Sequence, residues 1–251
     1  MWEFCISVDK NKLEIKNFMY EKCIAFMNEY SGVAAIDENQ MSYNILLAIN
    51  EYEKNRLVIF LRNLIDEVIC FFYKKDFLCE NLILNIQDEM TKQAFIFSLL
   101  YFDKETDKFI VNKYLNLDKK LDLDGFYNFR LSSLKDKWRE LIDIANQNEI
   151  YLYSDDTFTE LIKFLIDNLE IQSDVINIMQ KDNSYAIYDS NFNPINIYKE
   201  TNKNEGNLMA EIITMCPKNI NIYCSDIMPN KLKDLICKLF EKRVRFISKI
   251  N

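Results

Sequence analysis

The sequence predicts an α+β fold with a largely helical body, a small α/β layer at its N-terminus, and a C-terminal hairpin followed by a βαβ unit. The chain has 251 residues, of which 49% are hydrophobic and 28% charged, enough apolar side chains for a well-filled core. It has only 3 Gly and 3 Pro, so few turns can use a positive φ, which favours long helices over a many-stranded β fold. Apolar residues recur every three to four positions up to Glu170 and then mostly alternate, so the strands concentrate after that point.

The N-terminal layer begins with a β-like run from Trp2 to Val8. Apolar residues at helical spacing follow from Leu13 to Phe26, and the helix they predict ends before Ser31-Gly32. Two short strands are expected next, Val33 to Ile36 and Tyr43 to Ile49.

The segment Glu53 to Lys75 predicts the central helix of the body, because it is apolar except for one narrow polar strip. The strip consists of Arg62, Asn63, Asp66, Glu67, Cys70 and Lys74. Asp88 to Phe102 and Thr106 to Leu117 predict two further helices, and Thr157 to Leu169 another. Between them, Asp124 is the expected N-cap of a long helix whose apolar stripe runs from Tyr127 to Ala145.

After Glu170, the pattern predicts a hairpin, an edge strand, a short helix and a strand–helix–strand unit with parallel strands. The expected elements are strands 174–180 and 184–189, which turn at 181–183, edge strand 195–198, helix 208–216, strand 219–224, helix 231–242 and a final strand from Val244. A boundary near Ile171 divides a body, residues 1–170, from a tail, residues 171–251, and the two either fold separately or pack as one domain.

The segment DGFYNFRL, Asp124 to Leu131, resembles the YtxC-like family, together with FTELIKFLIDNLE (Phe158 to Glu170) and the DVINIMQ strand that follows. That family typically shows a D-G-F-x-N-F-R-L core, a later block with F/Y-x-x-x-I/L-x-x-L, and a short β-rich stretch. The Cys-Pro-Lys turn at 216–218 also looks similar. At 167–170 the chain has Asp-Asn-Leu-Glu where an aromatic and a glutamine are usual. The resemblance implies an intracellular protein of endospore-forming bacteria that is linked by name to sporulation, and it implies no catalytic residue.

Several common catalytic and cofactor sites are disfavoured by what the sequence lacks. It has no histidine, the commonest general base and zinc ligand, and its three glycines are isolated, so it has no Gly-rich phosphate loop. The closest cysteine pairs, 70/79 and 216/224, have spacings that do not suit a tetrahedral metal site. We therefore predict no cofactor, no metal and no catalytic residue, and we lean against an enzyme.

The first candidate site comprises Asp124, Asn128 and Arg130, in which the guanidinium could bind a phosphate or carboxylate by two hydrogen bonds. The alternative is that Arg130 pairs with a carboxylate between helices while Asp124 and Asn128 serve as cap and turn residues. The second candidate is Ser225 with Asp226, which follow a predicted parallel strand at the place where α/β sheets bind ligands. An ordinary strand-to-helix loop is the simpler explanation of this pair, and the one we favour.

Two weaker candidates have structural explanations. Asp155, Asp156 and Glu160 could hold Mg²⁺, but aspartates at a helix start also act as caps. Arg243 and Arg245 on the last strand could contact nucleic acid, but charges on an edge strand also prevent edge-to-edge pairing.

Net charge and the N-terminal sequence bear on location and partners. The net charge of −8 disfavours binding to nucleic acid and to anionic membranes. No secretory leader or transmembrane run is recognised, and seven cysteines without paired spacing fit reduced thiols in the cytoplasm. The favoured hypothesis is a non-enzymatic cytoplasmic protein that binds a protein partner or a small anionic ligand during spore formation. The alternatives are a metal-dependent enzyme with carboxylate ligands and, third, a nucleic-acid-binding factor.

Overall fold

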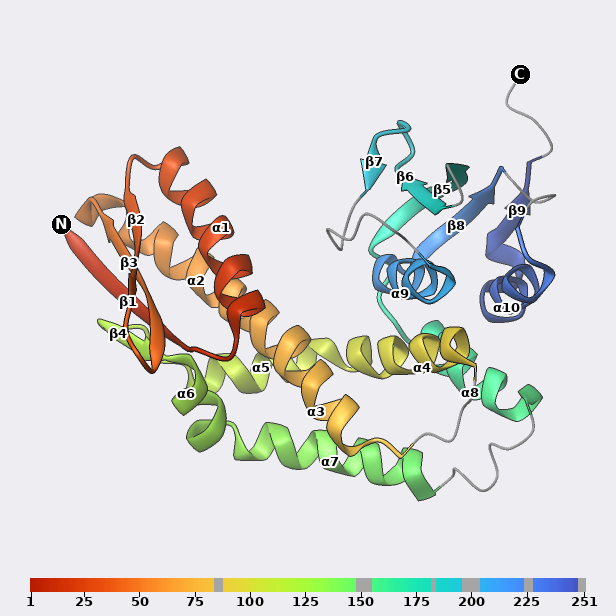
Figure 1. Ribbon diagram of the computed structural model, residues 1–251, viewed down its shortest axis with the longest axis horizontal. Coiled ribbons are helices and arrows are strands. Elements are labelled where there is room, and N and C mark those ends of the chain that lie inside the picture. The colour runs from red at the N-terminus through yellow and green to blue at the C-terminus, as the bar shows by residue number, and fades with distance from the viewer. Residues whose placement is uncertain (84–87, 148–154, 182–183, 196–203, 224–227, 248–251) are drawn as a thin grey trace. The chain divides into compact units, whose positions relative to one another are not determined.

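The computed structural model describes the chain except for residues 84–87, 148–154, 182–183, 196–203, 224–227 and 248–251 (Figure 1). The chain forms two compact units that are interleaved along the sequence. Unit 1 comprises Met1–Glu80 and Lys104–Asp143, and unit 2 comprises Asn81–Asp103 and Ile144–Asn251. Helices accompany a small sheet in each unit, so the predicted α+β class is confirmed.

The sheet of unit 1 has the strand order β2-β3-β1-β4. Its strands are β1 (Trp2–Asp9), β2 (Val33–Glu38), β3 (Ser42–Ile49) and β4 (Lys120–Asp122). β1 and β2 pair with β3 in antiparallel fashion, and β4 pairs with β1 in parallel. The first three strands match the prediction. β4 was not predicted, because three residues are too few for an alternating pattern to be visible.

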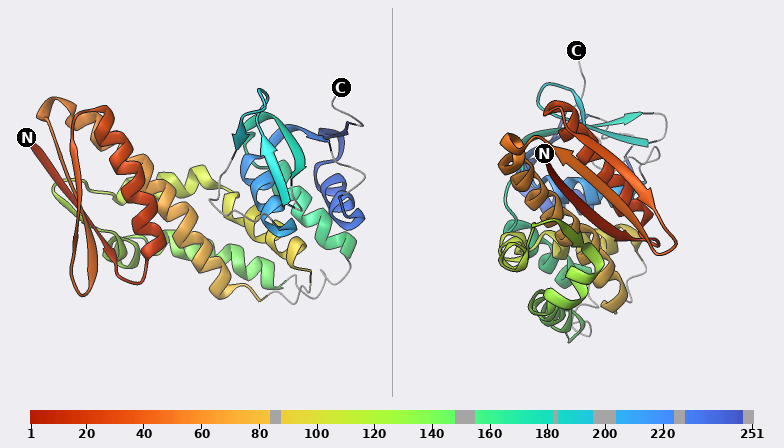
Figure 2. Two further views of the ribbon diagram at one scale, coloured as in Figure 1. Left: turned by 45° about the horizontal axis from the view of Figure 1, so that its top comes forward. Right: turned by 90° about the vertical axis from the view of Figure 1, so that its left-hand side faces the viewer.

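Helices account for the rest of unit 1, and α1 lies against one face of the sheet with α2 beside it (Figure 2). The helical segments are α1 (Leu13–Glu29), η1 (Glu51–Glu53), α2 (Lys54–Val68), the π-helix η2 (Ile69–Tyr73), α3 (Lys74–Asn81), α5 (Lys104–Tyr114), α6 (Leu123–Arg130) and α7 (Ser132–Gln147). The expected helix from Glu53 to Lys75 is thus continuous in space but contains a π-helical turn. The last residues of α7 belong to unit 2.

The predicted helix from Asp124 to Ala145 is broken at Leu131, which was an error in the prediction. Leu131 has φ −106° and ψ 33°, and it separates α6 from α7. Its side chain is fully buried. The next two residues are serines, which are weak helix formers and favour helix starts, so the chain can change direction here at little cost.

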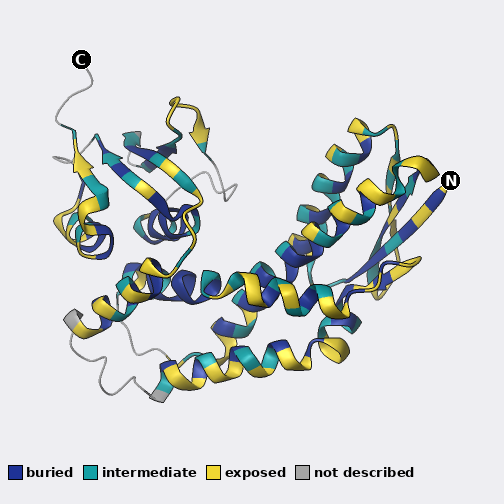
Figure 3. Cartoon of the chain, turned by 180° about the vertical axis from the view of Figure 1, so that it is seen from behind, coloured by how far each residue is buried: buried dark blue, intermediate teal, exposed yellow. Residues whose placement is uncertain are grey.

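Burial in unit 1 follows the expected periodicities. On β1 the residues Trp2, Phe4, Ile6 and Val8 point inward into one core that extends to Trp138 on α7. Figure 3 shows buried and exposed positions alternating along strands and following one side of the helices. Burying a large apolar side chain contributes roughly 1.5–3 kcal/mol, so this core is the main stabilising feature of the unit.

Unit 2 contains a sheet of order β7-β6-β5-β8-β9. Its elements are α4 (Glu89–Tyr101), α8 (Asp155–Asp167), β5 (Ser173–Lys181), β6 (Ser184–Tyr188), β7 (Pro194–Ile195), α9 (Glu205–Met215), β8 (Pro217–Ile222), α10 (Asn230–Phe240), η4 (Glu241–Arg243) and β9 (Val244–Phe246). The hairpin β5–β6 is antiparallel and β8–α10–β9 has parallel strands, which confirms both predictions. The residues 182–183 of the hairpin turn and 196–198 of the expected edge strand lie outside the described residues.

The compact units differ from the division expected near Ile171, because unit 2 takes α4 and α8 from the predicted helical body. α4 packs against both α8 and α9. Whether residues 1–170 and 171–251 fold as separate domains stays a prediction. Among the described residues, no helix combines the length and the apolar character that crossing a bilayer requires.

Candidate functional site

The DGFYNFRL segment forms α6 and the residue that follows it. Asp122, not Asp124, is the N-cap, since its Oδ1 accepts the backbone N–H of Gly125 at 2.9 Å. The prediction for Asp124 was therefore wrong by two residues, because β4 ends at Asp122 and the helix begins directly after it. A Cβ on Gly125 would come within 3.1–3.3 Å of the Asp122 carboxylate, so glycine allows this close cap.

Asp124 instead lies in the first turn of α6, where it joins three other elements of unit 1. Its Oδ1 accepts from the Lys12 Nζ and from the Tyr73 hydroxyl, each at 2.8 Å. Its Oδ2 accepts the backbone N–H of Asp9, also at 2.8 Å. The carboxylate is 19% exposed and has three donors, so it is occupied by its own unit and fixes α6 against the β1–α1 turn and the π-helix.

Aromatic rings surround the ammonium that holds Asp124. The Lys12 Nζ lies 3.5 Å from the centre of the Tyr73 ring and 5.9 Å from that of Tyr127. Burial, followed by the charge and hydrogen bond of Asp124, raises the pKa of Tyr73, so its hydroxyl remains a donor. Burial likewise raises the pKa of Tyr127 to about 12. The centres of the two rings are 4.5 Å apart, so the rings pack against each other.

The π-helix places a second polar cluster directly after Tyr73. Lys74 is 1% exposed, and its Nζ lies 2.7 Å from the Oδ2 of Asp107, which is fully buried. Lys137 on α7 contacts the other oxygen of Asp107, also at 2.7 Å. Burial lowers the pKa of Lys74, while Asp107 opposes this effect. π-Helical turns occur often at functional sites, but here the turn directs two adjacent side chains to two structural carboxylates.

The narrow polar strip of the central helix contains another buried acid. Asp66 is 5% exposed, and its Oδ2 accepts from the Asn112 amide. Its Oδ1 is buried without a hydrogen-bond partner among the described residues. Burial raises the pKa of Asp66 to about 6, although the Asn112 hydrogen bond, Lys108 and Arg62 oppose the increase and Glu105 adds to it.

The other end of α6 is exposed. Asn128, Phe129 and Arg130 are all exposed, and Phe129 retains 84% of its accessible surface. Within the described part of the chain, the Arg130 side chain makes neither a hydrogen bond nor an ion pair. The expected inter-helix ion pair is therefore not seen, although the Asn128 carbonyl accepts from Lys135 Nζ at 3.0 Å as a helix-end contact. Asp124 lies in the first turn of α6 and is held by its partners, whereas Asn128 and Arg130 lie exposed at the other end. The structure therefore does not bring the three residues into one site.

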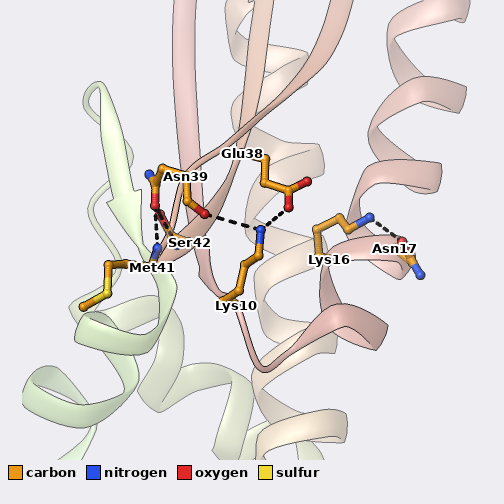
Figure 4. A network of polar contacts seen from close by, with 7 residues as sticks. All are labelled: Lys10, Lys16, Asn17, Glu38, Asn39, Met41 and Ser42. Atoms are coloured by element: carbon orange, nitrogen blue, oxygen red, sulfur yellow. Dashed lines mark hydrogen bonds and ion pairs between the residues drawn. The ribbon is translucent and has the colours of Figure 1, made fainter.

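The lysines at the start of α1 have partners of their own (Figure 4). Lys10 pairs with Glu38, and its Nζ also lies 3.3 Å from the Asn39 carbonyl oxygen. Lys16 donates to the Asn17 side chain at 2.6 Å. The turn between β2 and β3 is held by Asn39, whose Oδ1 accepts the backbone N–H groups of Met41 and Ser42 at 2.8 Å. These lysines thus contribute to the structure of the hairpin and the helix start.

The remaining candidates lie in unit 2, and the structure tests few of them. Ser225 and Asp226 lie outside the described residues, as do the side chains of Asp155 and Asp156 at the start of α8. Glu160 is exposed. Across the described residues, no group of three or more His, Cys, Asp and Glu is placed to hold a metal ion.

The two C-terminal arginines have different environments. The Nη2 of Arg243 lies 3.0 Å from the Oδ1 of Asp167, and its Nη1 lies 3.8 Å from the Sγ of Cys216. Burial raises the pKa of the Cys216 thiol, and Arg243 opposes this. Arg245 is exposed on β9, the last strand of the sheet order. Arg243 is thus a structural contact between α8 and the Cys-Pro-Lys turn.

Sequence reasoning missed the residues that connect the parts of unit 1. Lys12 and Tyr73 lie far from Asp124 in the sequence, and Lys137 lies 30 residues from Asp107. The available signal was the polar strip on an otherwise apolar helix, which contains both Asp66 and Lys74. Polar residues on a covered helix need buried partners, so the strip predicts a polar contact without identifying its members.

The fold defines a mixed α+β protein of two units interleaved along the sequence. Its DGFYNFRL segment forms the short helix α6, whose C-terminal end is exposed. A model of the YtxC-like family matches residues 45–245. The chain therefore belongs to the YtxC-like family, as the resemblance implied. No curated protein and no solved structure matches it.

Proposed function

We propose that the chain is a non-enzymatic cytoplasmic protein that acts in spore formation by binding another protein through Asn128–Arg130. The observation that carries the proposal is the contrast within one motif. Asp124, Phe126 and Leu131 are held inside unit 1, whereas Asn128, Phe129 and Arg130 are exposed. A largely exposed Phe next to an Arg without an ionic partner among the described residues has no evident role in the stability of the fold.

The types of residue support a protein partner. Aromatic residues and arginine are enriched among the few side chains that contribute most of the binding energy at protein interfaces. Phe129 supplies a large apolar surface, and Arg130 supplies a guanidinium that can pair with a carboxylate in two hydrogen bonds. We expect the partner to offer an apolar pocket beside an Asp or Glu.

A small anionic ligand at Arg130 is the second candidate and is less well supported. Binding sites for small molecules usually enclose roughly 70–90% of the ligand, whereas Arg130 and its neighbours are exposed. The lysines of unit 1 at the start of α1 already have partners in Glu38, Asn17 and Asp124. They are therefore poor second contacts for an anion.

The other two hypotheses gain no support from the described residues. An enzyme with carboxylate-bound metal would depend on Asp226 or Asp155, whose side chains are not described. A nucleic-acid-binding factor would use Arg243 together with Arg245, whereas Arg243 is paired with Asp167.

Site-specific photocrosslinking in sporulating cells tests the proposal. A photoreactive phenylalanine analogue replaces Phe129 in one strain and Phe109 in another. Phe109 is the matched control, because it too is an exposed phenylalanine of unit 1, 70% exposed on α5. We expect one protein to be crosslinked from position 129 and not from position 109.

Purified variants then quantify the contact with the captured partner. Phe129→Ala/Arg130→Ala should weaken binding by about 30-fold or more, the loss expected for residues of this kind at an interface centre. The control Phe109→Ala/Arg139→Ala should bind like the wild type. Equal losses in both variants, or crosslinking of no protein at position 129, would contradict the proposal. Binding of inorganic phosphate at Arg130 in the absence of a protein partner would favour the small-ligand candidate.

A further inference from the structure

The N-terminal sheet of unit 1 has one face packed against helices and one open face. Phe4 and Ile45 belong to the core on the inner face, and in the right-hand view of Figure 2 the sheet lies in front of α1. Strand pairing forms one row of the outer face from Ala35, Leu46, Cys5 and Lys120. In that row Leu46 is 42% exposed, and Ala35 and Lys120 are exposed. The described part of unit 1 therefore leaves this face open to a partner.

The outer face has an apolar part, which lies mainly on β2 and β3. The row next to that of Leu46 consists of Val33, Ala48 and Glu3, and Val33 is 63% exposed. Apolar side chains thus continue from one row to the next. We call them the outer patch, which comprises Val33, Ala35, Leu46, Ala48 and the half-buried Cys5. A contiguous exposed apolar patch on a sheet marks an interaction surface.

Acidic side chains surround the outer patch. The row on its other side consists of Asp37, Asn44, Ser7 and Asp122. With Glu3, the face carries three carboxylates against the one ammonium of Lys120, which leaves two negative charges. Lys120 and Asp122 are two residues apart on the same face of β4, so their charges offset each other. Glu3 and Asp37 form no ion pair with any described residue, and the Asn44 amide that donates to Asp37 at 3.2 Å leaves its charge in place.

The two uncompensated carboxylates lie at opposite ends of a diagonal across the outer patch. Asp37 is on β2, Leu46 on β3 and Glu3 on β1, three neighbouring strands, and each is one row further along the sheet. Leu46 is therefore midway between the two acids. With strands about 4.8 Å apart and rows about 6.6 Å apart, the Cα atoms of Asp37 and Glu3 are separated by about 16 Å. That distance equals the rise of about eleven residues of α-helix, after which a helix presents the same side again.

We infer that the outer patch binds a basic amphipathic helix of another protein. Such a helix, laid along the diagonal, packs its apolar stripe on Leu46 and places two Lys or Arg, about eleven residues apart, opposite Asp37 and Glu3. The side chains of Ala35 and Ala48 next to Leu46 are small, so the helix can approach the sheet closely. None of these residues belongs to Asn128–Arg130, so the inference goes beyond the function proposed above and does not depend on it.

Charge and size argue against other occupants. A second copy would bring its own two negative charges against these, and the face repels nucleic acid and anionic membranes in the same way. At about 19 Å by 26 Å, or roughly 500 Å², the face is smaller than the roughly 800 Å² that each partner buries in a stable complex. A single helix about 10–12 Å in diameter fits on it. The contact should be weak, with a dissociation constant on the order of 10 μM.

Binding of two designed peptides to the purified full chain tests the inference by fluorescence anisotropy. The basic peptide is a helix of about 18 residues, with an apolar stripe of Leu and Ala between two Lys that are about eleven positions apart. The acidic peptide has Glu in place of these two Lys. We expect saturable binding of the basic peptide near 10 μM and none of the acidic peptide up to about tenfold higher concentration. Phe129→Ala/Arg130→Ala should bind the basic peptide like the wild type, which separates this surface from that of the proposed function.

Substitutions on the face locate the bound peptide. Leu46→Lys should weaken binding of the basic peptide by about tenfold or more, because it places a cation in the apolar contact. If Leu46→Lys does not fold, Ala35→Lys on the same row replaces it. Ile59→Lys is the matched control, since Ile59 is 61% exposed on α2, and it should bind like the wild type.

A charge reversal tests the role of the two carboxylates. Glu3→Lys/Asp37→Lys should lose the basic peptide and gain the acidic one. Asp136→Lys/Glu140→Lys makes the same change in net charge on exposed positions of α7, and it should leave both affinities within about twofold of the wild type. Absence of saturable binding, equal binding of the two peptides, or equal losses in the two charge variants would overturn the inference. A wild-type dimer that appears in sedimentation and that Leu46→Lys disrupts would overturn it in favour of a second copy.

Discussion

At the start of α6 the Asp124 carboxylate accepts three hydrogen bonds from unit 1, whereas at its end Phe129 and Arg130 are exposed. The same eight-residue helix thus fixes its own position with one end and presents side chains with the other. Tight fixation of the first end pre-orders the second, which would lower the conformational-entropy cost of binding the proposed partner. This contrast suggests that loss of the first end should affect stability, and loss of the second should affect binding alone.

The largest expected effect comes from the buried ion pair next to the anchored end. Asp107→Ala leaves Lys74 buried without its carboxylate, and we expect a loss of about 3–5 kcal/mol in the free energy of unfolding. Replacing both residues, as Lys74→Met/Asp107→Leu, should cost much less, because no unpaired charge stays buried. Urea denaturation measures both variants. Equal losses in the single and double variants would show that the ion pair is not buried as described.

Asp124→Ala should have the next largest effect, a loss of about 2–3 kcal/mol, because hydrogen bonds to charged groups contribute about 1.5–3 kcal/mol and this carboxylate accepts several. Asp136→Ala is its control, since Asp136 forms an exposed pair with Arg139 that should contribute less than about 1 kcal/mol. Thermal unfolding distinguishes the two. A melting temperature for Asp124→Ala as high as that of the control would contradict an anchoring role.

Asp66 predicts a smaller effect of opposite sign. Its pKa is raised to about 6 in the folded chain from a usual value of 3.8, so the folded state binds its proton more tightly than the unfolded chain. This contribution makes the folded state progressively less stable as the pH rises from about 4 to about 6, and the penalty then stays constant. Asp66→Asn removes the ionisation, so we expect a gain of about 1–2 kcal/mol at pH 7 and little difference below pH 4. Urea denaturation across this pH range measures the difference, and an equal effect at both ends would contradict the burial of an ionised Asp66.

The sequence predicted the α+β class and most elements, because long apolar periodicities report directly on burial. It did not predict β4, the π-helix or the break at Leu131. Each is a short feature whose position depends on contacts distant in the sequence. Asp122 and Asp124 were equally plausible caps by residue type, and only the end of β4 distinguishes them.

The candidate site was predictable as a segment but not as an arrangement of side chains. The rarity of arginine drew attention to Arg130, and Arg130 is exposed in the structure. Nothing local in the sequence shows that Asp124 contacts Lys12 and Tyr73, because these residues are brought together by the packing of α1 and the π-helix. Periodicity identifies which side chains are buried, whereas pairing among buried polar groups depends on the tertiary structure.

The most direct test measures stability and partner binding together for the two ends of α6. Phe129→Ala/Arg130→Ala should change the free energy of unfolding by less than about 0.5 kcal/mol, as is usual for exposed positions, while abolishing capture of the partner and reducing the yield of heat-resistant spores. Asp124→Ala should lower stability. The account predicts that loss of stability and loss of binding separate in this way. A double variant that unfolds as readily as Asp124→Ala, or one that retains full partner capture and sporulation, would contradict it.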